Sequence, residues 1–455
     1  MIKVRFGLLF IAIIAVLIGH WILGAAPEQP RKDSVRYADY IFNLHTFQVF
    51  GLSYGKTETA PLPGAANAPL YPSLVSLFVT DKTNRSLACT LASTPRFDCQ
   101  SPGTSCGPIN VLNSCEPSLE PLILFNYALL ALSLFLCGWL AFSLTGSYLF
   151  LYFTPLFAFL SFQLTDYGQR LLVANLVIPL FLSLQLILLA FIKQPGLKLS
   201  SAAGILTGLL TLTRPEYLYM APVVAGCFWW LSKKPIYPAI LLIAFAMTLT
   251  PWIWRNHSHF DQTTLIQSNY GNHIATERIA LNQMSWTQWP VSFIYWFPDS
   301  GDKIAKFLFR KEVSGAFDNS SAYSIFAVPN SELFESIDPT RSPLKILADG
   351  FVKEPLKHIA VTLSLAWRGV FVGKIWGAVG LIGYLLLLYR ETSRGRYGLM
   401  WISVLPLFML AMRAGVSLNV PRYNAPMIGL LAMGWVYFLG ALSRSSIQHD
   451  LHTDD

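Results

Sequence analysis

Apolar residues along this chain gather into long runs, separated by short basic connections and by two long polar segments. A helix needs roughly 20 consecutive apolar residues to cross a bilayer, and runs near that length recur along the chain. Continuous runs favour helices, because a membrane barrel would alternate apolar and polar positions instead. The pattern predicts ten membrane spans, at residues 7–24, 120–142, 147–164, 171–192, 199–213, 217–232, 236–254, 374–390, 398–413 and 422–443.

The composition strengthens this interpretation. Hydrophobic residues make up 53% of the 455 positions and charged residues only 13%, with a mean hydropathy of +0.47. Soluble domains carry roughly twice that share of charge, about 25%. We therefore expect an all-α polytopic membrane protein.

The placement of basic residues predicts the orientation. In this count of spans, one side of the membrane holds Lys3, Arg5, Lys193, Lys198, Lys233, Lys234, Arg390, Arg394, Arg396 and Arg444. Short cytoplasmic loops concentrate Lys and Arg, so both termini are predicted to be cytoplasmic, in a protein of the cytoplasmic membrane. The net charge of +8 is then a topology signal and gives no reason to expect nucleic acid.

This topology divides the chain into six segments. They are a first span at 1–24, an outer loop at 25–119, spans two to seven at 120–254, a second outer loop at 255–373, spans eight to ten at 374–443, and a tail at 444–455. A cleaved signal peptide is an alternative interpretation of residues 1–26. In the second loop, apolar residues at helical spacing over 344–372 predict an interfacial amphipathic helix.

Four cysteines fall in the first outer loop: Cys89, Cys99, Cys106 and Cys115. In an oxidising compartment four thiols predict two disulfides, with three possible connectivities. A metal site is the alternative, but the spacings lack a paired C-x-x-C motif and no histidine lies among the four.

Ionisable residues gather at the predicted outer ends of spans. They form four groups, namely Asp33, Asp166 in the loop 165–170, Arg214 with Glu216, and Arg255 with Arg413 and Arg422. Charges at this depth are costly unless they are paired or face a wet cavity. Arginine binds phosphate oxygens bidentately and a carboxylate can accept a proton, so the set suits displacement of a phosphate leaving group from a lipid carrier.

Each member also has a plainer interpretation. Asp33 could be a solvated loop residue, and Asp166 an ordinary turn residue. Arg214 and Glu216 could pair with each other, while Arg413 and Arg422 could be helix-end residues that reach toward water.

An ordered series of motifs adds a family resemblance. The series runs through D-x3-Y (Asp33, Tyr37), P-L-Y-P (Pro69–Pro72, with Tyr71), L-T-R-P-E (Leu212–Glu216), T-P-W-x-x-R-N (Thr250–Asn256), K-E-P (Lys353–Pro355) and P-R-Y-x-x-P (Pro421–Pro426). In this order the chain resembles GT-C membrane glycosyltransferases of the protein O-mannosyltransferase and lipid A aminoarabinose transferase type.

The resemblance implies a GT-C-like bundle of about ten transmembrane helices and assigns roles to residues. It carries the role of catalytic base or substrate orienter to Asp33. It places Arg255 and Arg422 at the carrier phosphate, with Arg214, Tyr37 and Tyr71 as further candidates for binding substrate or carrier phosphate.

The sequence departs from the family pattern at two acidic positions. Ser34 follows Asp33 where many relatives have a second acidic residue, and Asn175 stands where they often have Glu. Asp166 and Glu216 are the candidate replacements. A divalent metal stays open, because hard cations prefer several carboxylate oxygens.

We therefore predict a hexosyl or pentosyl transferase that uses a polyprenyl-phosphate-linked sugar. Its acceptor would be a lipid, glycan or protein on the outer face of the cytoplasmic membrane. A flippase for a lipid-linked saccharide is the first alternative, although its polar groups would lie at mid-membrane. An O-antigen polymerase or ligase is the second, and it would be expected to lack the Asp33 loop.

Overall fold

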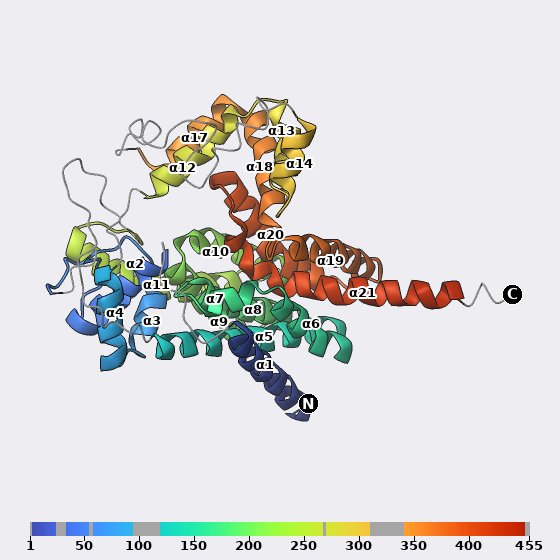
Figure 1. Cartoon of the computed structure of the whole chain (residues 1–455), viewed down its shortest axis with the longest axis horizontal. Helices are drawn as coiled ribbons and strands as arrows, with labels where there is room; N and C mark the ends of the chain where they lie inside the picture. Colours follow the sequence, from blue (N-terminus) through green and yellow to red (C-terminus); the bar gives the residue numbers. More distant parts are fainter. Residues whose placement is uncertain are drawn as a thin grey trace. The chain divides into compact units, whose positions relative to one another are not determined.

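The computed structural model describes residues 2–23, 33–53, 58–93, 119–266, 270–309 and 341–450. All regular structure in these residues is helical, which confirms the predicted all-α class. The chain forms two compact units, Met1–Gln267 and Ser268–Asp455 (Figure 1). The boundary between the units falls inside the segment predicted as the second outer loop.

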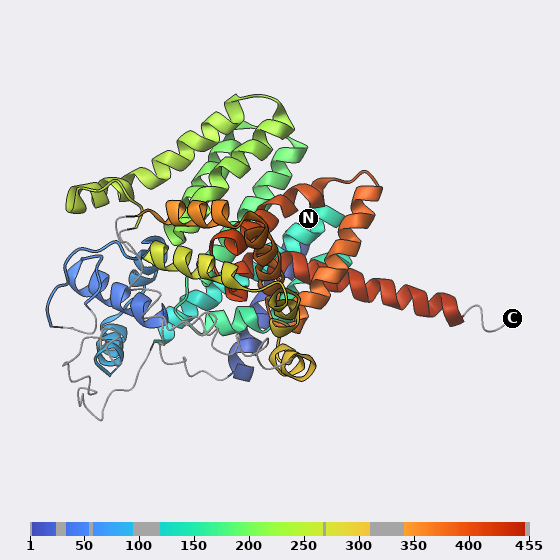
Figure 2. The same cartoon turned by 90° about the horizontal axis from the view of Figure 1, so that it is seen from above.

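Unit 1 is built from long apolar helices and a group of shorter ones. Its helices are α1 (Ile2–Leu23), α2 (Asp33–Phe47), α3 (Leu70–Ser76), α4 (Asp81–Ser93), α5 (Glu120–Thr145), α6 (Tyr148–Leu160), α7 (Gln163–Gly168), α8 (Ala174–Lys193), α9 (Leu197–Thr213), the 3-10 helix η1 (Pro215–Tyr219), α10 (Met220–Ser232) and α11 (Ile236–Phe260). Helix α5 packs against α1, α6 and α8, while α9 packs between α8 and α11 (Figure 2).

The packing of α9 on α11 depends on two glycines spaced four residues apart. A Cβ added to Gly204 would collide with the carbonyl oxygen of Leu241, and one added to Gly208 would lie 2.7 Å from Cβ of Thr248. Small residues at this spacing let two helix backbones approach closely, as in membrane helix pairs. Bulkier residues at either position would push the two helices apart.

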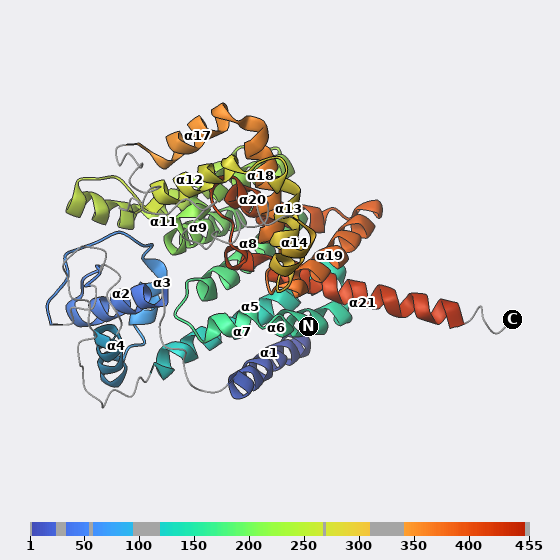
Figure 3. The ribbon, with the colours of Figure 1, turned by 45° about the horizontal axis from the view of Figure 1, so that its top comes forward.

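Helices α2, α3 and α4 form a separate group within unit 1. Helix α2 packs on both α3 and α4, and the three lie side by side in Figures 1 and 3. Val35, Ala38 and Phe42 recur at helical spacing on α2 and are all buried. The predicted first outer loop therefore has a packed helical part rather than an irregular tether.

Unit 2 combines interfacial-type helices with long apolar ones. Its described helices are α12 (Tyr270–Ala280), η2 (Leu281–Gln283), α13 (Gln288–Tyr295), α14 (Gly301–Leu308), α17 (Pro343–Lys353), α18 (Pro355–Gly369), α19 (Ile375–Ser393), α20 (Gly398–Val416), η4 (Pro421–Met427) and α21 (Ile428–Asp450). Helix α12 packs on α17, α18 on α20, and α19 on α21. Gly380, Gly383 and Gly434 allow the close contact of the last pair.

Eight of the ten predicted spans coincide with apolar helical stretches of the described residues; 217–232 and 374–390 are helical, in α10 and α19, but are not among those stretches. Among the described residues, five helical stretches are long and apolar enough to cross a membrane, at Glu120–Thr145, Ala174–Lys193, Ile236–Phe260, Gly398–Val416 and Pro421–Leu442. Shorter apolar stretches occupy Gly7–Leu17, Tyr148–Leu160 and Leu197–Thr213. These findings support an integral membrane protein.

Two boundaries differ from the sequence expectation. Helix α11 continues to Phe260, so Arg255 lies in a helix rather than at the start of a loop. The amphipathic helix expected over 344–372 is instead two helices, α17 and α18, separated at Glu354. Pro355 explains the break, because a proline disfavours helical backbone at the residue before it.

Candidate functional site

Helix α2 presents the predicted catalytic carboxylate at its first turn. Asp33 is the first residue of the helix and is partly exposed. An acidic residue is favourable there, since the first turn carries unsatisfied N–H groups and a partial positive charge. One turn later Tyr37 is buried, and its ring meets that of Tyr71 edge-on at 5.7 Å. The two predicted tyrosines thus anchor the helix that carries Asp33.

Tyr71 leads from α2 into a buried polar network. Its hydroxyl donates to Asn126 Oδ1 at 3.0 Å, and burial raises the pKa of the Tyr71 phenol. Asn126 Nδ2 in turn donates to the carbonyl oxygen of Arg170 at 3.0 Å. Asn175 Nδ2 reaches the same oxygen at 3.0 Å and that of Tyr167 at 2.9 Å. Asn175, which departs from the family pattern, therefore supports the turn after α7.

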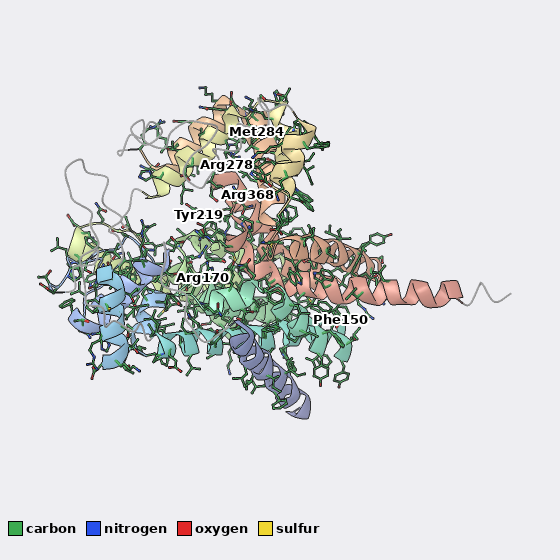
Figure 4. The ribbon with its side chains drawn as sticks, viewed as in Figure 1. Phe150, Arg170, Tyr219, Arg278, Met284 and Arg368 are labelled. Carbon is green, nitrogen blue, oxygen red and sulfur yellow. The ribbon has the colours of Figure 1, made fainter. Side chains whose placement is uncertain are left out.

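That turn carries an exposed ion pair. Arg170 Nη2 lies 2.9 Å from Asp166 Oδ1, and each side chain is 40% exposed. Figure 4 shows Arg170 just beyond α7. The contacts described so far connect the α2 helix of Asp33, through Tyr37, Tyr71 and Asn126, with the predicted acidic residue Asp166 and its partner Arg170. All of these residues belong to unit 1.

Arg255 holds together two parts of the first predicted outer loop. Its Nη1 donates to the carbonyl oxygen of Gly64 at 2.9 Å, and its Nη2 donates to that of Phe50 at 3.1 Å. Its guanidinium also lies 4.8 Å from the ring of Trp252, a cation–π distance. In this structure Arg255 is a clamp on the loop, and its role toward phosphate stays a prediction.

The sequence interpretation missed a second carboxylate on α2. Asp39 is only 3% exposed and accepts hydrogen bonds from Asn43 Nδ2 at 2.9 Å, Ser53 N at 3.0 Å and Ser53 Oγ at 2.5 Å. It fixes the chain that follows α2, which Arg255 also holds. The sequence did carry a signal that Asp39 is buried. Asp39 lies four residues after Val35 and three before Phe42, and residues at these spacings share one face of a helix.

Arg214 and Glu216 adopt the pairing that was weighed as the plainer alternative. The two side chains approach to 3.4 Å, with 19% and 31% of them exposed. Pro215 begins the 3-10 helix η1 between them, which places the two residues on one turn at the end of α9.

In unit 2 the P-R-Y motif forms the start of η4. Arg422 is exposed, and its guanidinium lies over the ring of Tyr423 at 5.2 Å. Arg413 is buried instead of reaching toward water, and its Nη1 donates to the carbonyl oxygen of Tyr423 at 2.5 Å and to Asn424 Oδ1 at 3.3 Å. The alternative of a water-exposed helix end is therefore wrong for Arg413.

Unit 2 also contains a buried arginine that sequence reasoning did not single out. Arg278 is fully buried and donates to the carbonyl oxygens of Ala414 and His358, at 2.8 and 2.9 Å, and to Asn282 Oδ1 at 2.9 Å (Figure 4). Burial lowers the pKa of Arg278 to about 9, so it remains charged at neutral pH. Its partners come from three elements, so Arg278 ties α12 to α18 and α20.

Two neighbours of Arg278 titrate unusually. Burial, together with the charge of Arg278, lowers the pKa of His358 to about 4. Burial raises the pKa of Glu277 to about 7. Further along the same helix as His358, Arg368 is partly exposed, and its guanidinium lies 5.5 Å from the ring of Trp296.

The cysteines and the metal question are only partly covered by the described residues. Cys89 on α4 is disulfide-bonded. Cys99, Cys106 and Cys115 lie outside the residues that the structure describes, so the pairing stays a prediction. Within the described ranges, no three His, Cys, Asp or Glu residues gather in a way that could hold a metal ion.

The chain was also compared with known proteins. No protein-family model matches it, and none of the curated proteins does. Among solved structures, it is similar to the crystal structure of ArnT from Cupriavidus metallidurans bound to undecaprenyl phosphate. The match has 10% identity and a TM-score of 0.41, and it covers 96% of this chain and 78% of that chain.

Proposed function

We propose that this protein is a membrane glycosyltransferase that moves a hexosyl or pentosyl group from a polyprenyl-phosphate carrier to an acceptor in the cell envelope. The carboxylate of Asp33 carries this proposal. It stands partly exposed at the first turn of α2, while Tyr37 and Tyr71 anchor the next turn of the same helix. A fixed carboxylate in a largely apolar helical protein suits chemistry on a lipid-borne substrate.

The proposed reaction is a single displacement. Asp33 accepts the proton of an acceptor hydroxyl, whose oxygen bonds to the anomeric carbon of the sugar. The bond from that carbon to the phosphate oxygen breaks, and the electron pair leaves with polyprenyl phosphate. The anomeric configuration inverts, because the hydroxyl attacks from the side opposite the leaving group.

The departing phosphate needs positive charge to stabilise it. Arginine guanidiniums suit this role, because their forked donors match phosphate oxygens and stay charged at any relevant pH. Arg255 and Arg422 are assigned here by the motif resemblance, with Arg214 as a further candidate. Arg255 would give up its contact with the carbonyl oxygen of Gly64 or Phe50 to bind phosphate directly.

The orientation is part of the proposal. Both termini would be cytoplasmic and the Asp33 segment would face outward, in the inner membrane of the cell. Single-cysteine labelling in intact cells tests this, with a cysteine placed at Lys82 of α4. A thiol reagent that does not cross membranes should label that position without lysis. Labelling only after lysis would reverse the orientation.

The experiment on function compares two aspartates that each begin a helix of unit 1. Asp33→Asn should abolish release of polyprenyl phosphate from a sugar-loaded carrier, because no base remains for the acceptor. Asp81→Asn, at the exposed first residue of α4, should retain release. Mass spectrometry of the freed carrier reports turnover whichever sugar or acceptor is used. The screen would supply a panel of sugar-loaded carriers and an envelope extract as the acceptor source.

Two outcomes would contradict the proposal. Full release by the Asp33→Asn variant would remove the catalytic role of that residue. Passage of the intact sugar-loaded carrier across the membrane, with no freed phosphate in any combination, would instead favour the flippase.

A further inference from the structure

The segment between α6 and α8 contains features that the reaction above does not use. Phe162, directly before α7, adopts a left-handed conformation with φ of 55°. That conformation is uncommon for a residue with a bulky side chain, and such residues cluster at functional sites. Thr165 is fully buried, and its hydroxyl has no hydrogen-bond partner among the described residues. Both features oppose folding, so this local structure is maintained by the surrounding packing.

Two buried asparagines fix the backbone of Arg170. Asn126 and Asn175 are 0% and 5% exposed, and each donates a hydrogen bond to the carbonyl oxygen of Arg170. The two amides come from α5 and α8, so separate helices of unit 1 hold this carbonyl. Burying polar amides is unfavourable unless their hydrogen bonds are made. The network therefore gives Arg170 a defined position.

The side chain of Arg170, unlike its backbone carbonyl, is not enclosed by this network. It is 40% exposed and contacts Asp166 at 2.9 Å. An exposed ion pair of this kind contributes little to stability, because water solvates both charges when the pair is open. The buried scaffold thus holds in place an ion pair that can open at low cost.

The same network connects Arg170 to the proposed site. Asn126 accepts a hydrogen bond from Tyr71, whose ring contacts Tyr37 on α2, and Tyr37 lies one turn after Asp33. We propose that Arg170 is a ligand of the carrier phosphate and exchanges Asp166 for it. The carboxylate of Asp166 pairs with the guanidinium of Arg170 until the carrier binds. This inference rests on the proposed function.

The chemistry of the exchange favours phosphate. The freed carrier, polyprenyl phosphate, is a phosphate monoester, whereas the sugar-loaded carrier is a phosphodiester with a single charge. The monoester carries more negative charge than a carboxylate and offers more oxygens to the fork of the guanidinium. Removing Asp166 should therefore strengthen carrier binding, whereas removing Arg170 should weaken it. A purely structural ion pair predicts the same direction of change for both substitutions.

The test is a double-mutant cycle on the full chain purified in detergent. The probe is undecaprenyl phosphate, with bound fraction measured by native mass spectrometry. Arg170→Gln should weaken binding about ten-fold, and Asp166→Asn should tighten it several-fold. Arg170→Gln should cost more in the Asp166→Asn background than in the wild type, because the competing carboxylate is gone. Arg85→Gln, exposed on α4, removes one positive charge from unit 1 and should leave binding unchanged.

The outcomes separate the two proposals. If the wild-type chain does not bind undecaprenyl phosphate, the use of a polyprenyl-phosphate carrier fails and the exchange fails with it. If the wild type binds and Arg170→Gln binds equally well, or if both substitutions weaken binding, only the exchange is overturned. Should Arg170→Gln melt early, Arg170→Lys keeps the charge without the fork. That variant should fold and bind several-fold more weakly, and unchanged binding by it would refute the exchange.

Discussion

Replacing Asp39 by Asn should destabilise unit 1, although the substitution changes the shape of the side chain very little. Asp39 Oδ2 accepts from the backbone nitrogen of Ser53, and Oδ1 accepts from Asn43 and from the Ser53 hydroxyl. An asparagine keeps one oxygen, so its NH₂ group must face a donor. The folded state then loses a hydrogen bond to a charged acceptor and buries an unsatisfied N–H group, at a cost of about 2–4 kcal/mol.

The assay is thermal unfolding in detergent, followed by tryptophan fluorescence. For a unit of this size the loss corresponds to a fall in Tm of roughly 5–10 °C. Asp33→Asn is the matched variant, since Asp33 is partly exposed at a helix end and its loss should lower Tm by no more than about 2 °C. An unchanged Tm in Asp39→Asn would refute the assignment of Asp39 as a structural carboxylate. If that variant also lost activity while Asp33→Asn kept it, Asp39 would be the better candidate for catalysis.

Three further predictions concern packing and pH. Gly208→Val should lower Tm, because the larger side chain forces α9 away from α11. Gly226→Ala is the control and should keep its Tm, since a Cβ added there meets nothing within 4 Å. Equal Tm values for the two variants would contradict the packing argument. Because burial and Arg278 lower the pKa of His358 from 6.5 to about 4, the stability tied to its neutral ring is full above about pH 6.5 and is lost as the pH falls toward 4. His358→Gln should lack this contribution, so its Tm should rise less, or fall more, than that of the wild type between about pH 4 and 6.5; identical profiles would contradict it. Because burial raises the pKa of Glu277 from 4.5 to about 7, its contribution is lost as the pH rises from about 4.5 to 7, so in the wild type it offsets that of His358. Glu277→Gln should therefore make Tm rise more steeply over this range, and an unchanged slope would show that Glu277 makes no such contribution.

Local features of the site follow from the sequence because they depend on neighbours along the chain. Asp33 and Tyr37 are four residues apart and therefore share one face of a helix. Arg214 and Glu216 are separated by one residue, and their pairing was among the alternatives considered. Long apolar runs likewise predict helices, since a chain in lipid must satisfy its backbone hydrogen bonds internally. Pro355 also signals a helix break at the residue before it, and the single helix predicted over 344–372 overlooked that signal.

Only the tertiary structure decided which polar residues have a structural role. Arg255 binds the carbonyl oxygens of Phe50 and Gly64, which are 205 and 191 residues away in the chain. Asn175 supports the carbonyl oxygen of Arg170 through its side chain. Every residue type offers the same backbone carbonyl, so such an acceptor leaves no trace in the sequence. The sequence by itself predicted the all-α class and singled out Asp33, whose catalytic role stays a prediction. Only the folded chain decided that Arg255 holds the loop, because its carbonyl partners are brought close by packing alone.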